Sequence, residues 1–191
     1  MADSLQTTLA DEEATSALGA RLALTARPGD ILALHGDLGM GKTALARGFV
    51  RALADADEDV PSPTFTLVQT YPVETDAGDL TIWHFDLYRL RDPGDAWELG
   101  LEEALDGISL IEWPDRLQHE LPRRRLDLTL TESVLPWHAD TGTKGAEAGR
   151  KTGRLATLTA RGGSDWLARL TRTPEPEPEP ALHPEENFSR E

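Results

Sequence analysis

Hydrophobic and polar positions recur with two different periods along the first third of the chain. Residues 11–23 place apolar side chains at a helical spacing, and Asp11 is suited to cap the first turn. Residues 31–36 form a short apolar run that ends in glycine, and residues 43–53 return to the helical pattern. A strand, a glycine-rich loop and a helix in this order predict one unit of an α/β protein.

Two β-rich runs follow this unit. Residues 64–73 and 80–90 have the composition of strands, and the segment 74–79 between them is rich in turn-forming residues. We therefore predict an antiparallel hairpin. Residues 92–105 then predict a helix that begins near Pro93.

The remaining patterned segments predict three more strands and a helix. Residues 107–113 form a buried strand that Pro114 stops. Residues 125–132 and 154–161 alternate apolar and polar side chains, as half-buried strands do. Residues 163–170 predict a short closing helix.

Two segments lack these patterns. Residues 136–152 are polar and rich in glycine, which predicts a flexible surface loop. The segment after residue 173 begins PEPEPEP and has six acidic residues and one arginine, so it cannot bury enough apolar surface to fold alone. We predict one folded domain over residues 1–172 and a disordered acidic tail over residues 173–191.

The charge of the chain limits its direct partners. The 191 residues include 19 Lys and Arg against 34 Asp and Glu, a formal net charge of −15. This balance argues against an autonomous nucleic-acid binder, so any role near RNA would run through a partner protein. The chain has no cysteine, no apolar run that could span a membrane and no secretory signal at its start, which predicts a soluble cytoplasmic protein.

The glycine-rich loop carries the most specific chemistry. Residues 36–43, GDLGMGKT, match the P-loop pattern G-x-x-x-x-G-K-[ST] in full, between a predicted strand and a predicted helix. Glycines allow successive N–H groups to surround phosphate oxygens, and the helix adds the positive end of its dipole. The lysine reaches the β- and γ-phosphates and the threonine hydroxyl ligates Mg²⁺. We assign the nucleotide contacts to Gly36, Asp37, Leu38, Gly39, Met40, Gly41, Lys42, Thr43 and Ala44.

A P-loop enzyme needs a further carboxylate at a strand end to support the metal. Asp86, in HFDLYR, lies toward the end of the predicted strand 80–90, and Glu112 lies toward the end of the predicted strand 107–113. Glu112 is the better candidate because it follows an apolar run. A carboxylate buried there would be costly unless it were paired with a cation such as the metal.

The choice of nucleotide and reaction depends on motifs outside the loop. The chain has no D-x-x-G, and its single asparagine, Asn187, excludes the Asn-Lys-x-Asp motif of GTPases, so ATP is favoured over GTP. A small-molecule kinase would need an arginine-bearing lid. Residues 121–126, LPRRRL, could supply one, but a basic turn before a strand is the favoured interpretation because β alternation follows directly.

Four motifs together resemble one family. GDLGMGKT, SPTFTLV, HFDLYRL and IEWP, in this order, resemble the bacterial tRNA threonylcarbamoyladenosine biosynthesis ATPase, the TsaE (YjeE) family, over about residues 5–135. The resemblance implies an α/β fold, a P-loop NTPase-like three-layer sandwich with a mixed sheet that includes an antiparallel hairpin. It also implies weak Mg²⁺-dependent hydrolysis of ATP by the domain 1–172.

The resemblance further implies a place in an assembly. The partners would be a threonylcarbamoyl-transferase catalytic subunit and its paralogous partner subunit, with tRNA met only through these and no membrane involved. The product is a modified adenosine next to the anticodon in tRNAs that read codons beginning with A. The ATPase would reset the assembly between turnovers rather than transfer the group.

Residue roles follow from the matched motifs. Lys42 and Thr43 resemble the phosphate lysine and the metal threonine, and Glu112 resembles the second metal ligand. Asp86 resembles the acid that supports hydrolysis. Thr64, in a mobile switch segment, could sense the γ-phosphate, or the segment could be a strand entry stiffened by proline.

Other positions are less specific. Glu12 resembles the residue near the adenine, Trp113 lies either near the nucleotide or in the core, and Phe65 and Leu67 are expected in the core. Tyr88 and Arg89 contact a partner or the phosphates, or form a plain surface pair. We assign no nucleotide contact to Arg150 or Arg154, which lie beyond the matched motifs.

Three functions are therefore compared. The leading hypothesis is an ATPase subunit of a tRNA-modifying assembly. The alternatives are a small-molecule kinase and a non-catalytic nucleotide-binding scaffold.

Overall fold

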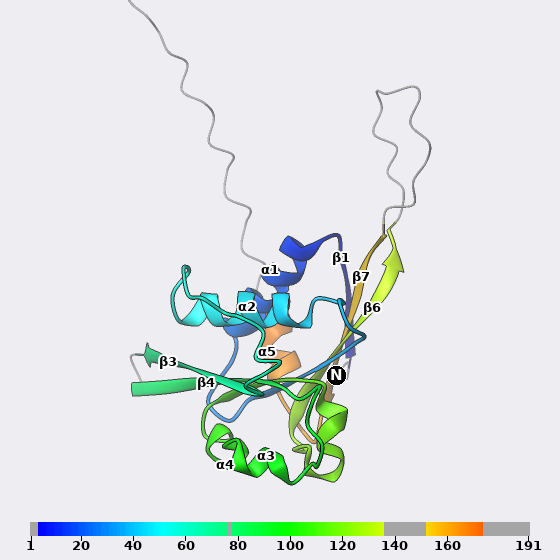
Figure 1. Ribbon diagram of the computed structural model, residues 1–191. Coiled ribbons are helices and arrows are strands. Elements are labelled where there is room, and N and C mark those ends of the chain that lie inside the picture. The colour runs from blue at the N-terminus through cyan, green and yellow to red at the C-terminus, as the bar shows by residue number, and fades with distance from the viewer. Residues whose placement is uncertain (1–3, 76–77, 136–151, 174–191) are drawn as a thin grey trace, which may run out of the picture.

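The described strands form one mixed sheet. A computed structural model describes residues 4–75, 78–135 and 152–173, and its seven-stranded sheet has the order β1-β7-β6-β2-β5-β4-β3 (Figure 1). β2 is parallel to β5 and β6, β4 is parallel to β5, and the other neighbours are antiparallel. The strands are β1 (Ser4–Leu9), β2 (Ile31–His35), β3 (Val68–Thr75), β4 (Gly78–Asp86), β5 (Ile108–Glu112), β6 (Arg125–Val134) and β7 (Thr152–Arg161).

Helices cover both faces of this sheet (Figure 1). One face carries α1 (Glu12–Ala23), α2 (Lys42–Leu53) and α5 (Trp166–Arg172), and the other carries α3 (Asp95–Glu98), α4 (Leu101–Ala104) and the 3₁₀ helix η1 (Pro114–Glu120). Each face has its own apolar cluster, one centred on Phe49 and Trp166 and the other on Phe85 and Leu117. The predicted fold class, a three-layer α/β sandwich with a mixed sheet and an antiparallel hairpin, is confirmed.

Glycines allow α1 and α2 to pack closely. A β-carbon on Gly19 would lie 2.1 Å from the Leu45 carbonyl oxygen, and one on Gly48 would lie 2.1 Å from the Ser16 carbonyl oxygen. Asp11 caps α1 as predicted, because its carboxylate accepts a hydrogen bond from the Ala14 N–H at 2.9 Å. The beginning of α1 is thereby held beside the beginning of α2.

The predicted hairpin forms, but its strands have different bounds. Residues 64–67 form a turn rather than strand, since Leu67 has a φ of 65° and its N–H donates to the Pro63 carbonyl. The second strand ends at Asp86, where Leu87–Leu90 turn away from the sheet. β3 continues to Thr75 and β4 begins at Gly78, so both strands extend into the segment predicted as a turn. Residues 76–77 of that segment lie outside the described residues.

Two other elements differ from the sequence predictions. The single helix predicted over 92–105 is two short helices, because Gly100 between them has a φ of 86°. β1 was not predicted, and it pairs with β7 as the edge of the sheet.

The predicted loop and tail lie mostly outside the described residues. Thr152, which the sequence analysis assigns to the loop, is the first residue of β7, and the rest of the predicted loop, 136–151, is not described. The tail from residue 174 also lies outside the described residues, whereas Thr173 is described and its hydroxyl donates to the Arg169 carbonyl at 3.2 Å.

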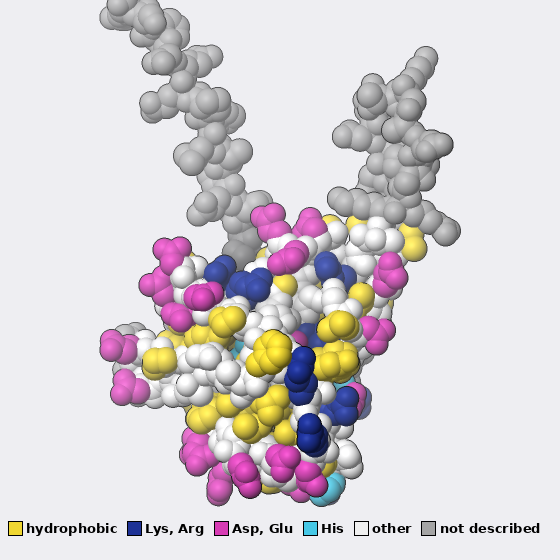
Figure 2. All heavy atoms as spheres, in the orientation of Figure 1, with side chains coloured by type: hydrophobic (Ala, Val, Ile, Leu, Met, Phe, Trp, Pro, Cys, Tyr) yellow, Lys and Arg dark blue, Asp and Glu magenta, His cyan; other side chains and the backbone are white. Residues whose placement is uncertain are grey.

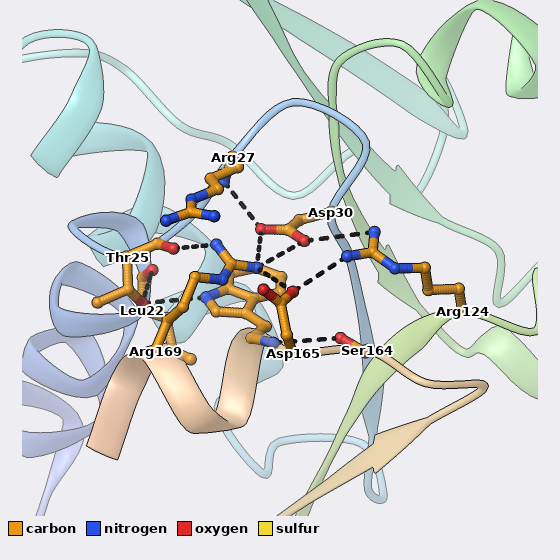
Figure 3. Close-up of polar contacts among 9 residues, drawn as sticks. Leu22, Thr25, Arg27, Asp30, Arg124, Ser164, Asp165 and Arg169 are labelled. Atoms are coloured by element: carbon orange, nitrogen blue, oxygen red, sulfur yellow. Dashed lines mark hydrogen bonds and ion pairs between the residues drawn. The ribbon is translucent and has the colours of Figure 1, made fainter. Parts of the chain in front are cut away.

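A charged network fixes the edge of the sheet where β2 begins (Figure 3). Asp30, which precedes β2, is almost fully buried and accepts hydrogen bonds from Arg169 at 2.8 and 2.7 Å. Arg169 also donates to the Thr25 carbonyl, and Arg124 pairs with Asp165 at 3.0 Å. This network joins the ends of α1, β2, β6 and α5. The P-loop follows the opposite end of β2.

Candidate nucleotide-binding site

The P-loop leaves the carboxyl end of β2 and opens α2. Gly36, Gly39 and Gly41 have φ values of 134°, 81° and 98°, which only glycine adopts without strain. Gly41 is the N-cap of α2, and no side chain of the described residues caps that helix. The N–H groups of the first turn are therefore not bound by a capping side chain and suit an anionic ligand.

Lys42 is held under this loop. Its ammonium donates to the carbonyl oxygens of Gly36 at 2.6 Å and Asp37 at 2.9 Å, and lies 4.0 Å from the centre of the Trp113 ring. Burial lowers the pKa of Lys42 below its ordinary value, although nearby carboxylates, chiefly Glu112, oppose that shift. The aromatic face and the carbonyls thus fix a partly desolvated cation at the P-loop.

Glu112 ends β5 and is buried directly beneath the first turn of α2. The Thr43 hydroxyl donates to its Oε1 at 2.8 Å, and Nε2 of His84 lies 2.9 Å from the same oxygen. His84 is completely buried, and its Nδ1 has no hydrogen-bond partner within the part of the chain that the structure describes. These contacts place the two predicted metal ligands, Thr43 and Glu112, side by side.

Asp86 is a second buried carboxylate at the same edge. Its Oδ2 accepts hydrogen bonds from the hydroxyls of Ser62 at 3.1 Å and Thr64 at 2.7 Å. Its Oδ1 accepts from the Tyr88 N–H at 3.1 Å. Asp86 therefore ties the SPTF segment to the end of β4.

The sheet itself explains why these groups meet. β4 and β5 are parallel, and Asp86 is directly opposite Glu112 in their register. β5 is also parallel to β2, with Glu112 opposite Leu34, two residues before the P-loop. Carboxyl ends of parallel strands share one edge of a sheet, which is where ligands bind in α/β proteins.

Ten of the thirteen predicted site residues line one cleft of about 270 Å³; Gly36, Asp37 and Met40 do not border it. Glu12 borders it from α1, where its carboxylate lies 3.5 Å from the Arg47 guanidinium. Trp113, for which sequence left two interpretations, is partly exposed and lines the cleft as well. The predicted site residues that border this cleft are Glu12, Leu38, Gly39, Gly41, Lys42, Thr43, Ala44, Thr64, Asp86 and Glu112.

The donor set suits magnesium better than a transition metal. Thr43 and Glu112 offer oxygen atoms, and no group of three or more His, Cys, Asp or Glu that could hold a metal exists among the described residues. Mg²⁺ is usually bound by one or two protein oxygens together with substrate phosphates. The residues present therefore fit a magnesium–nucleotide complex.

The structure corrects one prediction near the cleft and adds one residue to the site. Phe65 is not in the core: its side chain is 84% exposed, and the Arg89 guanidinium lies 4.6 Å from its ring centre. Tyr88 packs on Trp113 with ring centres 5.0 Å apart. His84 was missed, although it lies two residues before Asp86 on the same face of a strand, which is the signal that could have revealed it.

Two of the three arginines considered for a kinase lid, Arg124 and Arg125, are bonded to carboxylates away from the P-loop. Arg124 pairs with Asp165 and lies 3.9 Å from Asp30, at the edge where β2 begins (Figure 3). Arg125 donates to Asp127 on its own strand at 2.6 Å. The segment 121–126 is thus a basic turn that leads into β6.

A complete P-loop between a central parallel strand and a helix, with a strand-end carboxylate bonded to its threonine, defines a P-loop nucleotide-binding protein. A sequence model of the family described as "Threonylcarbamoyl adenosine biosynthesis protein TsaE" matches residues 9–135. The chain belongs to the TsaE family. The predicted family is confirmed, which relates the chain to tRNA threonylcarbamoyladenosine biosynthesis and implies the use of a nucleotide.

Individual relatives agree with this assignment. The tRNA threonylcarbamoyladenosine biosynthesis protein TsaE of Rickettsia bellii is 42% identical over 126 residues, which cover 65% of this chain and 85% of the relative. The protein of the same name from Bacillus subtilis is 38% identical over 120 residues, 62% of this chain and 72% of the relative. The crystal structure of Bacillus subtilis YdiB superposes with a TM-score of 0.64 at 30% identity, covering 90% of this chain and 97% of that one.

Proposed function

We propose that this chain is a Mg²⁺-dependent ATPase subunit of an assembly that makes threonylcarbamoyladenosine in tRNA. The observation that carries the proposal is the hydrogen bond of 2.8 Å between Thr43 and Glu112, directly beside the buried Lys42. P-loop NTPases use such a hydroxyl and such a carboxylate to hold the metal of a bound nucleotide. ATP is preferred over GTP because the chain has no Asn-Lys-x-Asp motif.

The site residues have separate tasks in this proposal. The N–H groups of the P-loop and Lys42 bind the phosphates, and Thr43 and Glu112 hold Mg²⁺, which would neutralise charge on the β- and γ-phosphates. Glu12 borders the cleft from α1, where it would lie near the adenine.

Thr64 and Asp86 form the hydrolytic part of the site. Their hydrogen bond of 2.7 Å links the SPTF segment to the sheet. A Thr64 hydroxyl that turns to the γ-phosphate would free one acceptor position on Oδ2 of Asp86, which would keep its bond from Ser62 and accept a second hydrogen bond from the attacking water. The SPTF segment would then report which nucleotide is bound.

Exposed apolar side chains beside the cleft support a role in an assembly. Leu38 is 77% exposed on the P-loop and Phe65 is 84% exposed in the SPTF segment. Figure 2 shows hydrophobic side chains gathered on one face among Lys and Arg side chains, with acidic side chains around them. Partners that cover this face, the transferase catalytic subunit and its paralogous partner, would sense the bound nucleotide and be reset by hydrolysis.

The remaining features agree with indirect contact with tRNA. A net charge of −15 disfavours direct binding of an RNA backbone. None of the helices in the described ranges has the length and apolar character of a membrane span. The curated relatives are named for tRNA threonylcarbamoyladenosine biosynthesis, which supports the same process here.

Phosphate release from ATP, measured with and without the two partner subunits, tests this function. We expect slow hydrolysis alone and clear stimulation by the partners, with Glu112→Gln lowering the stimulated rate by about 10²-fold or more because a metal ligand is lost. Glu102→Gln, an exposed glutamate on α4, is the matched control and should leave the rate unchanged. No stimulation, or transfer of the phosphate to a small molecule, would contradict the proposal.

A further inference from the structure

Three arginines line a pocket at the edge of the sheet where β2 begins. The pocket has a volume of about 310 Å³, and its lining includes Leu24, Arg27, Arg169, Arg172 and Thr173. These residues belong to the segment between α1 and β2 and to the end of α5. The P-loop follows the opposite end of β2, and the pocket shares no residue with the nucleotide cleft. The pocket is therefore separate from the proposed nucleotide site.

Two of these arginines are exposed, and the described residues leave both guanidinium groups unpaired. The main-chain N–H of Arg27 donates to Asp30 at 2.8 Å, but its guanidinium forms no hydrogen bond or ion pair within the described ranges (Figure 3). The guanidinium of Arg172 has no such partner in the same ranges either. A guanidinium has five N–H donors, so each of the two can bind a carboxylate through a pair of hydrogen bonds.

Arg169 adds a buried guanidinium to the same pocket. Its side chain is only 10% exposed, and its Nε has no hydrogen-bond partner among the described residues. The two acids beside it, Asp30 and Asp165, are already bonded to Arg169 and Arg124 (Figure 3). With the two exposed arginines unpaired, this edge keeps an excess of positive charge in a chain of net charge −15. Such a pocket suits an acidic ligand.

The course of the chain favours one occupant. Residue 174 directly follows Thr173, which lines the pocket, and begins the acidic segment, residues 174–191. Its first glutamate, Glu175, is two residues beyond Thr173, so at most roughly 7 Å of main chain separates them. A ligand joined to its site by so short a link has an effective concentration on the order of millimolar or more.

The composition of the acidic segment also matches the pocket. Residues 174–180 read PEPEPEP, which provides a carboxylate at every second position. Guanidinium–carboxylate pairs are among the strongest polar contacts in proteins. The prolines between the glutamates are suited to pack on Leu24, which is 64% exposed, and their restricted main chain lowers the entropy lost on binding.

We propose that this pocket binds the chain's own acidic segment through Glu175, Glu177 and Glu179. Docked there, the segment neutralises the arginines that the rest of the described chain leaves unpaired. The inference does not depend on the proposed function, because none of the residues that carry it borders the nucleotide cleft.

NMR spectroscopy of the whole chain tests this docking. Residues 24–26 border the pocket and are far from the acidic segment in sequence, so their main-chain N–H signals report contacts made through space. We expect the triple variant Glu175→Gln, Glu177→Gln, Glu179→Gln to shift these signals at low salt. Salt at about 1 M should abolish the difference between this variant and wild type, because exposed charges are then screened.

A second triple variant is the matched control. Glu185→Gln, Glu186→Gln and Glu191→Gln together remove the same charge from the same segment. They should leave the signals of residues 24–26 in place, because the proposal assigns docking to the glutamates nearest Thr173.

Substitution of the arginines completes a double-mutant cycle. In an Arg27→Gln, Arg172→Gln background, the substitutions at Glu175, Glu177 and Glu179 should lose most of their effect on the signals. In an Arg91→Gln background they should keep it, since Arg91 is exposed and lies outside the pocket.

Three results would overturn the proposal. The first is signals that do not respond to the triple variant of residues 175–179, or that respond equally to the control triple variant. The second is a shift caused by inorganic phosphate or a short RNA without any response to the variant, which would assign the pocket to an external anion. The third is a dependence of the wild-type signals on protein concentration, which would assign the pocket to the acidic segment of a second copy.

Discussion

Glu112 is a buried carboxylate held by donors of two kinds. The Thr43 hydroxyl belongs to the proposed metal site, whereas His84 lies behind the carboxylate, in the sheet. His84 is completely buried and its Nδ1 has no hydrogen-bond partner among the described residues, so a proton on Nε2 is the arrangement that satisfies Glu112. Groups that orient a metal ligand in this way affect metal affinity without contacting the metal.

Substitution of His84 tests this positioning role. His84→Leu should destabilise the fold by about 1–3 kcal/mol, because Glu112 loses a buried donor. It should also weaken Mg²⁺-dependent nucleotide binding by about 10–100-fold. His84→Gln, whose amide can donate from near the Nε2 position, should retain most of both. Urea unfolding and a magnesium titration measure the two effects, and equal losses in the two variants would show that the donor is irrelevant.

For single residues, the sequence predicts the candidate site residues that belong to recognisable motifs. It does not predict positions whose burial depends on the tertiary fold. The P-loop residues, Asp86 and Glu112 were identified because their types and spacing are visible along the chain. Phe65 was placed in the core from its apolar character, but the turn at Leu67, with a φ of 65°, leaves it exposed. The nucleotide and metal contacts themselves stay predictions.

The packing of α1 against α2 is the main element-scale determinant of the cleft. Gly19 and Gly48 allow the helix backbones to approach, and this places Glu12 and Thr15 beside the first turn of α2. Because the two helices are close, Glu12 of α1 borders the cleft on that side. Any side chain at these two positions would have to displace a backbone carbonyl.

Gly48→Ala should therefore destabilise the protein although alanine favours helices. The new methyl group would lie 2.1 Å from the Ser16 carbonyl oxygen, so α1 must shift, at a cost of about 1–3 kcal/mol. Nucleotide affinity should fall with it as Glu12 moves away. Gly94→Ala is the control, since its φ is −66° and its nearest contact is a side-chain oxygen at 3.2 Å. Thermal and urea unfolding measure the stability of both variants. Equal stability of the two would contradict the close packing of α1 against α2 at Gly48.

Elements with a strong period were predicted well, and elements defined by tertiary contacts were not. α1, β2, α2 and β5 lie within a residue or two of the predicted segments because one face or the whole strand is apolar. β1 is an edge strand in which four of the six residues are polar and only Leu9 is buried, and it is defined by its pairing with β7. The helix predicted over 92–105 is interrupted at Gly100, which has a left-handed conformation and whose lack of a side chain lets it pass the Trp83 ring.

On the scale of the whole molecule, charged groups around Asp127 link neighbouring strands of the sheet on the side of β6 and β7. Arg125 donates to this carboxylate at 2.6 Å and Arg161 at 2.8 Å, while Nε2 of His35 lies 3.6 Å away. Burial alone would raise the pKa of Asp127, but His35, Arg161 and Arg125 outweigh it and hold that pKa well below its usual range. Asp127 thereby links β6, β7 and the end of β2.

Asp127 should make stability depend on pH in the acid range. Because its pKa is lower in the folded than in the unfolded chain, its contribution is complete above the unfolded value near 4 and is lost as pH falls toward the folded value. Asp127→Asn should be about 2 kcal/mol less stable than wild type at pH 7, and the difference should shrink below about pH 4. Urea unfolding from pH 7 to 3, with Glu102→Gln as the exposed control, checks this; a constant difference would contradict it.

The fold class and the family were readable from the whole sequence because several motifs occur in one order. The division into a domain over 1–172 and an acidic tail stays a prediction, since residues 136–151 and 174–191 lie outside the described ranges. Partner contacts also could not be derived, because they depend on surfaces of other chains. The exposed Leu38 and Phe65 are the features from which such contacts can now be sought.

Calorimetric titration of the purified chain with ATP is the most direct test of the central claim, that the P-loop holds a triphosphate whose Mg²⁺ is completed by Glu112. We predict saturable binding to one site that requires Mg²⁺, is lost in Lys42→Ala and is weakened by Glu112→Gln. No heat of binding with Mg²⁺ present, or binding that is unaffected by Mg²⁺ and by both substitutions, would contradict it.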